Sequence, residues 1–199
     1  MWSLNECKHV FFAVGLIGIV LCFAPTIARV VDIRPQDSFS ELYILGSGRM
    51  ANDYPFNVST DGNYNVTLGV GDHMGSSMYY QVDVMLRNES ESMPNGTFSS
   101  SLPVLYQYNI FLGDGQIWND TLTFSFPQVV FSGNGSCSVN KMKLNDAEIQ
   151  LDRTAVWDNE NYGFYYQLLV ELWFYNQTSD ELLYDGRYVG LWLNMTSTT

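Results

Sequence analysis

Cysteine is scarce in this chain, and its three copies are placed where they cannot cross-link a domain. Cys7 and Cys22 lie before and within the apolar run of residues 10–28, so the chain beyond that run contains Cys137 alone. No intrachain disulfide can form there, although small exported domains often depend on disulfides. We expect Cys137 to be a buried or partly buried free thiol, and an intermolecular bridge is the alternative.

Histidine is also scarce, which limits the chemistry that the chain can perform. His73 is the only histidine beyond the apolar run. A blue-copper site needs two histidines, a cysteine and usually a methionine, so adding Met74 and Cys137 does not complete one. A Ser-His-Asp triad has no Gly-x-Ser-x-Gly sequence to support it. We therefore expect His73 to be a loop residue, and we assign no catalytic residue, no metal ligand and no cofactor.

Acidic residues are abundant, but their arrangement specifies no site. Of the 21 acidic residues only Glu6 precedes the apolar run, so some carboxylates must lie close together by number alone. The candidates for a glycosidase pair are Asp152, Asp158, Glu160 and Glu171. Asp114 and the segment 158–161 offer oxygen ligands for calcium, although solvated turns explain these residues more simply. We predict that the protein is not an enzyme.

Positively charged residues are also few, with 9 lysines and arginines against 21 acidic residues. The formal net charge is -12, and Lys141 and Lys143 are the only lysines beyond the apolar run. Such an acidic surface repels phosphate backbones, so we expect no nucleic-acid partner. Hydrophobic residues at 46% and aromatic residues at 15%, with only 15% charged, are typical of a packed globule. The roughly 165 residues beyond the first thirty or so suffice for one domain with its own core.

One long hydrophobic segment, VFFAVGLIGIVLCFAPTIA at residues 10–28, carries no charge. As a helix it would reach about 28 Å, close to the roughly 30 Å hydrocarbon core of a bilayer. It is long for the apolar part of a signal peptide, and residues 26–28 form only a weak cleavage site. We predict a single-pass anchor in the lipid bilayer, with residues 1–9 in the cytoplasm and a stem at 29–38 leading to an extracellular domain at 39–199. A cleaved signal peptide is the alternative.

Asparagine is the most informative abundant residue. The glycosylation pattern Asn-x-Ser/Thr occurs at Asn57, Asn65, Asn88, Asn95, Asn119, Asn134, Asn176 and Asn194. Sixteen asparagines and 29 serines plus threonines in 199 residues would produce two or three matches by chance. All eight lie beyond the apolar run, which predicts an exterior surface that carries N-linked glycans. A polar, turn-rich sequence that matches the pattern without being modified is the alternative.

Alternating apolar and polar residues predict a series of β-strands separated by turns. The expected strands are residues 39–45, 64–70, 78–87, 102–112, 122–126, 129–131, 138–144, 148–151, 162–175 and 182–195. Residues 71–77 are expected to form a hairpin loop, Pro127 to end its strand, and a helix at 141–151 is the alternative to the hairpin there. We predict an all-β protein, an antiparallel immunoglobulin-like β-sandwich with an inserted hairpin near 132–161.

Four short motifs in the first half of the domain have a familiar order. They are LYILG at 42–46, YPFN at 54–57, VTLGVG at 66–71 followed by His73, and YQV at 80–82. Together they resemble the archaeal membrane-anchored family called domain of unknown function 1616. The segments 163–176 and 187–196 resemble the last two strands of that family. The chain departs from the family pattern in having Asp72 before His73 where asparagine is usual, and in having a single membrane segment.

The resemblance implies an exported β-sandwich on an archaeal surface, and it implies no activity. We therefore expect a non-enzymatic, glycosylated cell-surface protein that serves assembly, adhesion or envelope structure, with other envelope or membrane proteins as partners. One alternative is an accessory subunit of a membrane complex, for which Gly15 and Gly18 offer a helix-packing face. Another is a carbohydrate-binding module. The aromatic side chains that could stack on sugars are Tyr79, Tyr165, Trp173 and Trp192.

Overall fold

The computed structural model describes residues 12–14, 16–19, 38–60 and 62–197. The chain divides into two units, Met1–Ser38 and Phe39–Thr199. In the first unit residues 12–14 and 16–19 are helical. Most of the predicted anchor and nearly all of the predicted stem lie outside the described residues. No helix within the described part of the chain is long and apolar enough to span a membrane.

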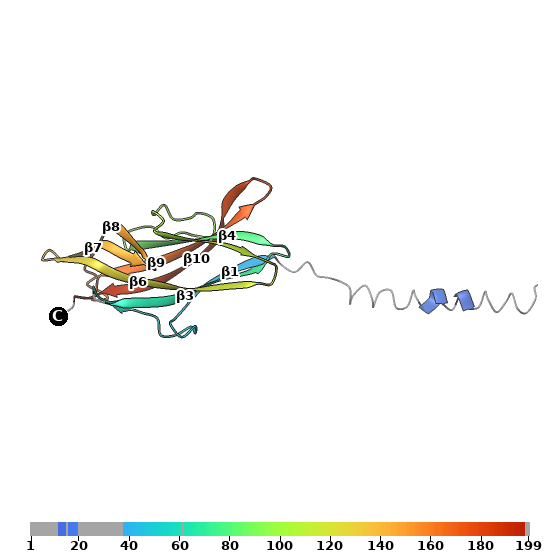
Figure 1. Ribbon diagram of the computed structural model, residues 1–199, viewed down its shortest axis with the longest axis horizontal. Helices are drawn as coiled ribbons and strands as arrows, with labels where there is room; N and C mark the ends of the chain where they lie inside the picture. The colour runs from blue at the N-terminus through green and yellow to red at the C-terminus, as the bar shows by residue number, and fades with distance from the viewer. Residues whose placement is uncertain (1–11, 15, 20–37, 61, 198–199) are drawn as a thin grey trace, which may run out of the picture. The chain divides into compact units, whose positions relative to one another are not determined.

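The second unit is a sandwich of two five-stranded sheets, which confirms the predicted all-β class (Figure 1). The first sheet has the strand order β1 (Phe39–Leu45), β3 (Asn63–His73), β6 (Ile117–Ser132), β7 (Ser136–Leu144) and β8 (Ala147–Val156). The second sheet has the order β2 (Asn57–Val58), β10 (Glu181–Met195), β9 (Tyr165–Asn176), β4 (Met78–Asn88) and β5 (Tyr106–Leu112). All pairings are antiparallel except β2 with β10.

The core lies between the sheets and follows the two-residue period of the strands. Successive side chains of a strand point to opposite faces, so the residues that face the other sheet recur at every second position. The fully buried apolar side chains of the four central strands include Val66, Leu68 and Val70 of β3, Leu122 of β6, Tyr80, Val82 and Val84 of β4, and Tyr166, Leu168, Val170 and Leu172 of β9. The core-facing residues of these strands therefore follow the alternation of apolar residues in the sequence.

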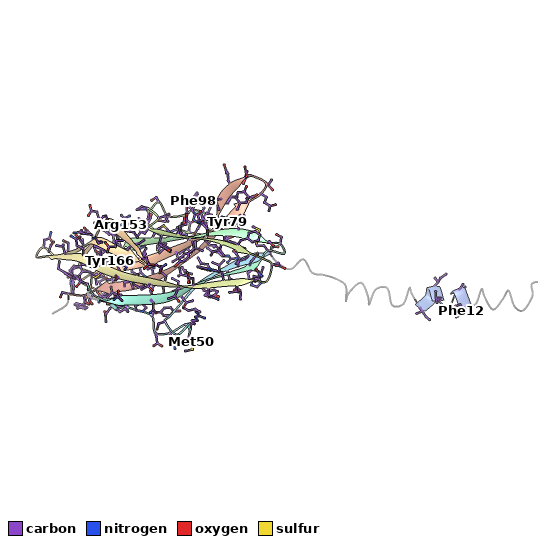
Figure 2. The ribbon with its side chains drawn as sticks, viewed as in Figure 1. Phe12, Met50, Tyr79, Phe98, Arg153 and Tyr166 are labelled. Carbon is purple, nitrogen blue, oxygen red and sulfur yellow. The ribbon has the colours of Figure 1, made fainter. Side chains whose placement is uncertain are left out.

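Tyr166, labelled in Figure 2, is fully buried and links the two sheets through hydrogen bonds. Its ring comes from β9, and its hydroxyl donates a hydrogen bond to the carbonyl oxygen of Cys137 at 2.6 Å and accepts one from the backbone N–H of Ala155 at 3.2 Å. Cys137 and Ala155 are register partners on β7 and β8. Cys137 is a buried free thiol, as expected, and burial raises its pKa to about 11.

The expectation that Pro127 ends a strand is wrong. β6 continues through it to Ser132, and the register with β7 shifts between Ser125 and Gln128. Proline has no N–H to donate to the ladder, and a bulge leaves a residue without a partner, so proline is tolerated there. The sequence pattern for two short strands therefore belongs to a single long strand with an irregularity in its middle.

The alternative of a helix at residues 141–151 is also wrong, because β7 and β8 form a hairpin at the edge of the first sheet. Asn145 in the turn has a φ of 50°, a conformation that asparagine tolerates. Its backbone N–H donates to the carbonyl oxygen of Thr123 on β6, and its side-chain oxygen accepts a hydrogen bond from the backbone N–H of Thr123. Its side-chain nitrogen donates to the hydroxyl of Tyr108 on β5. These contacts hold the turn against both sheets.

Several strand boundaries differ from the sequence expectation, among them the start of β6 at Ile117 and the end of β8 at Val156. β3 extends to His73, so the hairpin loop is shorter than predicted and His73 is a strand residue rather than a loop residue. β5 begins at Tyr106, four residues later than expected. β9 begins at Tyr165, because Tyr162 has a φ of 56°, which an extended strand does not allow. The short strand β2 carries no alternation and has no sequence signal of its own.

Candidate functional site

The eight predicted glycosylation residues lie on the surface of the domain. Asn57, Asn65, Asn95, Asn119 and Asn134 are exposed, whereas Asn88, Asn176 and Asn194 are half-buried. Asn65 of β3 and Asn119 of β6 share the outer face of the first sheet, where their register partners are Thr123 and Gly69. Asn176 ends β9, at the hairpin tip that projects from the body of the domain (Figure 1). None of the eight is a core residue.

Local hydrogen bonds orient three of these side chains in the same way. The side-chain oxygens of Asn88, Asn95 and Asn176 each accept the backbone N–H two residues later, from Ser90, Thr97 and Thr178. This Asx-turn uses the oxygen and leaves the amide nitrogen, to which a glycan is attached, free to point elsewhere. In each case the residue two positions on is the hydroxyl residue of the glycosylation pattern.

Two of the eight amide nitrogens are held by hydrogen bonds. Asn88 Nδ2 donates to the carbonyl oxygen of Thr154 at 2.8 Å, and Asn194 Nδ2 donates to Asn57 Oδ1 at 3.0 Å. The amide nitrogens of the other six have no hydrogen-bond partner among the described residues. Among the described residues, two of the eight attachment atoms are therefore hydrogen-bonded and six are not.

The outer face of the second sheet is buried to a degree that the sequence pattern did not indicate. Residues 89–105, between β4 and β5, fold across it. A Cβ added to Gly186 would lie 2.6 Å from the carbonyl oxygen of Gly96 in this segment. Met85 and Leu169 on this face are 1% and 0% exposed. Both faces of β4 and β9 are thus covered, one by the first sheet and the other by this loop.

A pair of carboxylates lies beneath that loop. Asp83 of β4 and Glu171 of β9 are register partners on the same face, 4% and 1% exposed. Glu171 Oε1 accepts the backbone N–H of Ser100 at 2.6 Å, and Asp83 accepts the side-chain amides of Gln81 and Gln107. Burial raises the pKa of Glu171, the nearby charge of Asp83 raises it further, and the Ser100 N–H acts in the opposite direction.

The other acidic candidates are not brought together with this pair. Asp152 lies on β8 in the first sheet, while Glu171 lies on β9 in the second. Asp158 Oδ1 accepts the backbone N–H of Glu160 at 2.7 Å, and its other oxygen binds the amide of Asn161. Hydrogen bonds from Asn161 and Glu160 lower the pKa of Asp158. Within the described ranges, no three His, Cys, Asp or Glu residues form a group that could hold a metal ion.

Asp72, which precedes His73 near the end of β3, lies among the buried residues of the domain. Asp72 is fully buried, and its Oδ1 lies 3.2 Å from the Tyr80 hydroxyl and 2.9 Å from the backbone nitrogen of Met74, both donors. The neighbouring His73 stacks on Phe39 with ring centroids 4.6 Å apart, and its Nε2 lies 3.7 Å from Glu41 Oε1. His73 therefore packs within the β1–β3 strand pair.

An aromatic groove lies at one end of the second sheet's outer face. The groove has a volume of about 400 Å³. Its lining residues are Phe56, Glu89, Asn161, Tyr165 and Trp192. Trp192 is 37% exposed, and the Arg87 guanidinium carbon lies 5.1 Å from the centroid of its ring. Tyr165 donates its hydroxyl to the carbonyl oxygen of Asn161 at 2.7 Å, and its ring lies 6.1 Å from that of Phe56.

The ionisable group that lines this groove is the carboxyl of Glu89. Burial raises the pKa of Glu89, with Asp158 adding to the effect and Arg87 opposing it. Of the four aromatic residues expected to bind sugars, Tyr165 and Trp192 line the groove, whereas Trp173 packs on Tyr184 and Tyr79 pairs with Phe111 elsewhere on the sheet. Sequence reasoning missed Phe56 and Glu89, because they lie in segments far from β9 and β10.

The model of the family Domain of unknown function (DUF1616) matches residues 34–133. The chain belongs to this family. The resemblance seen in the motifs of the first half is thereby confirmed. A comparison of this DUF1616 protein with curated proteins found no match.

Solved structures share the sandwich arrangement at very low identity. A beta-glucosidase from Listeria innocua in complex with glucose is 8% identical with a TM-score of 0.41. The similarity covers 80% of this chain and 16% of the glucosidase chain. The CARDB domain of the PF1109 protein from Pyrococcus furiosus, in complex with di-metal ions, is 9% identical with a TM-score of 0.40. The similarity covers 80% of this chain and 89% of the CARDB domain. One chain in a complex of human Zinc 2-glycoprotein and Prolactin inducible protein is 9% identical with a TM-score of 0.38. The similarity covers 82% of the present chain and 99% of that one. The chain thus spans about 16% of the glucosidase's length, and these likenesses carry no inference about function.

Proposed function

We propose that this DUF1616 protein is a non-enzymatic, N-glycosylated cell-surface protein of an archaeal envelope. Its immunoglobulin-like β-sandwich would serve assembly, adhesion or envelope structure. The observation that carries the proposal is the position of the eight glycosylation asparagines. They lie on both outer faces and in the turns of the domain, and none of them is buried. A pattern this dense and confined to the surface fits an exterior protein better than a chance match of polar turns.

The membrane attachment is part of the same proposal. Residues 10–28 form an uncharged apolar segment of bilayer length, and every glycosylation pattern follows it. In this arrangement the segment tethers the sandwich to the lipid bilayer and leaves residues 39–199 outside the cell. Other envelope or membrane proteins are the partners that such a domain would meet.

The domain has apolar side chains available for such contacts. Phe98 in the segment that covers the second sheet is 70% exposed, and Phe111 on the edge strand β5 is 72% exposed. Edge strands with exposed aromatic groups are suited to contact with another protein. Few lysines and a net charge of -12 make an acidic surface, which favours partners that are neutral or basic.

Glycopeptide mass spectrometry on native protein tests the glycoprotein half of the proposal. We expect glycans on several of the eight asparagines, and unmodified asparagine at all eight would refute it. The mature N-terminus tests the anchor separately. A protein that begins at residue 29 would exclude a permanent anchor while leaving export intact, whereas retention of residues 10–28 in a detergent-extracted protein supports it.

A further inference from the structure

A glycosylation residue and the aromatic groove lie on the same face of the second sheet. Asn57 of β2 is the register partner of Asn194 of β10, and Asn194 is the register partner of Tyr165 of β9. Alternation places all three on the outer face, because Val58 beside Asn57 is fully buried in the core. Tyr165 lines the groove, as does Phe56, which precedes Asn57 in the chain.

The two asparagines of this row have different roles. Asn194 is half-buried, its oxygen accepts the backbone N–H of Phe164 at 3.2 Å, and its nitrogen donates to Asn57 Oδ1. A Cβ on Gly163 would come within 2.4 Å of the Asn194 side chain, so there is little room around it. Asn57 is exposed, its oxygen is fixed by Asn194, and its amide nitrogen has no partner among the described residues. Asn57 is the attachment point beside the groove.

The lining of the groove suits a saccharide. Aromatic rings stack on the C–H face of a sugar ring, and Phe56 and Trp192, 48% and 37% exposed, supply two of them beside the nearly buried Tyr165. Glu89 and Asn161 supply groups that bind sugar hydroxyls. The Arg87 guanidinium stacks on Trp192, and its Nε and Nη1 are buried without a hydrogen-bond partner in the described structure. The carboxyl of Glu89 disfavours an acidic sugar, so a neutral one fits best.

We propose that the aromatic groove holds the neutral saccharide N-linked to Asn57 of the same chain. The inference rests on the proposed glycosylation and adds a specific role for one glycan. The glycan covers the apolar rings of the groove and thereby stabilises the end of the sandwich at which β2, β9 and β10 meet. The glycan is bound by the domain to which it is attached and does not extend freely into solvent.

Oxidative footprinting of the full chain, produced in a host that N-glycosylates proteins, tests the proposal without altering the groove. The measured quantity is the oxidation rate of Trp192, with Trp157 as internal control, since these rings are 37% and 39% exposed. The variants are Asn57→Gln and, as matched control, Asn65→Gln, which removes a glycan from the other sheet. Glycopeptide analysis of the same samples gives the occupancy of Asn57.

We expect Trp192 to oxidise at least about twofold faster in Asn57→Gln than in the parent chain, because a stacked sugar shields an aromatic face. Trp157 should not change, and Asn65→Gln should change neither ring. The melting temperature gives a second readout that does not depend on oxidation chemistry. Asn57→Gln should lower it by about 2–4 °C, and this difference should vanish when Trp192→Ala is present in both chains.

Equal oxidation of Trp192 in Asn57→Gln and the parent chain, with Asn57 occupied, would overturn the inference and leave the proposed function standing. An unmodified Asn57 would also overturn it, and the proposed function would fail with it only if the other seven asparagines were unmodified too. Free glucose and free N-acetylglucosamine distinguish an external ligand. If either sugar protects Trp192 in the chain whose Asn57 is occupied, the groove is open to other molecules and the assignment to the Asn57 glycan is wrong.

Discussion

Replacing Tyr166 by phenylalanine tests how the two sheets are held together. The substitution keeps the ring in the core and removes only the hydroxyl, which bridges the carbonyl oxygen of Cys137 and the backbone N–H of Ala155. Tyr166 is 0% exposed, so water cannot replace the lost partner. Both backbone groups belong to the opposite sheet, and both lose a hydrogen bond in a dry environment.

The size of the effect follows from that geometry. A buried backbone group deprived of its partner costs about 1–3 kcal/mol, so two groups together should cost about 3 kcal/mol when partial relaxation of the strands is allowed. In a domain of this length 1 kcal/mol moves the melting temperature by about 2–4 °C, which predicts a decrease of about 6–12 °C.

Thermal and urea unfolding of Tyr166→Phe against the parent protein measure this directly. The matched control is Tyr54→Phe, because the Tyr54 hydroxyl also donates to a backbone carbonyl, that of Ile44, but at the exposed surface. The control should lose about 0.5–1.5 kcal/mol or less. A decrease in Tyr166→Phe no larger than in the control would refute the bridging role of this hydroxyl.

Three further predictions concern Glu171, Gly69 and the engaged asparagines. The raised pKa of Glu171 means that its stabilising contribution is complete below the unfolded pKa and is lost as pH rises through the folded pKa. Glu171→Gln should therefore raise the urea midpoint at neutral pH and have little effect in acid; an equal gain at both would contradict the assignment. Gly69→Ala should cost about 1–3 kcal/mol, because the new Cβ would lie 2.1 Å from the Tyr43 ring, and the loss measured by urea unfolding should shrink in a Tyr43→Ala background. If glycans are attached to the folded domain, glycopeptide occupancy should be lower at Asn88 and Asn194, whose amide nitrogens are hydrogen-bonded, than at Asn95 and Asn134; equal occupancy would show that attachment precedes folding.

The strands and their inward faces could be predicted from local pattern alone. β1 has the bounds expected from its sequence, Phe39–Leu45, and the alternation in β4 and β9 identified the residues that form the core. The reason is that side-chain direction in a strand repeats every two residues, so one buried face leaves a visible period in the sequence. The glycosylation pattern is likewise local, since it depends on three consecutive residues.

Features that depend on what covers a strand could not be predicted. The pattern of β9 shows which residues share a face, but Glu171 and Leu169 are buried because residues 89–105 fold across that face. β2 has only two residues and exists through its parallel pairing with the end of β10, a contact between residues 137 positions apart. Pro127 ends a strand by local rules, and only the register shift against β7 lets β6 continue through it.

The sequence by itself determined that the chain has an uncharged apolar segment, a disulfide-free all-β domain and eight surface asparagines in glycosylation patterns. Composition and short-range periodicity contain that information. Only the tertiary structure decided that Phe56, Glu89, Tyr165 and Trp192 line one groove, and that Asn57 lies beside it. The physical reason is that strand register sets which distant residues become neighbours. Register depends on the packing of whole sheets rather than on any one segment.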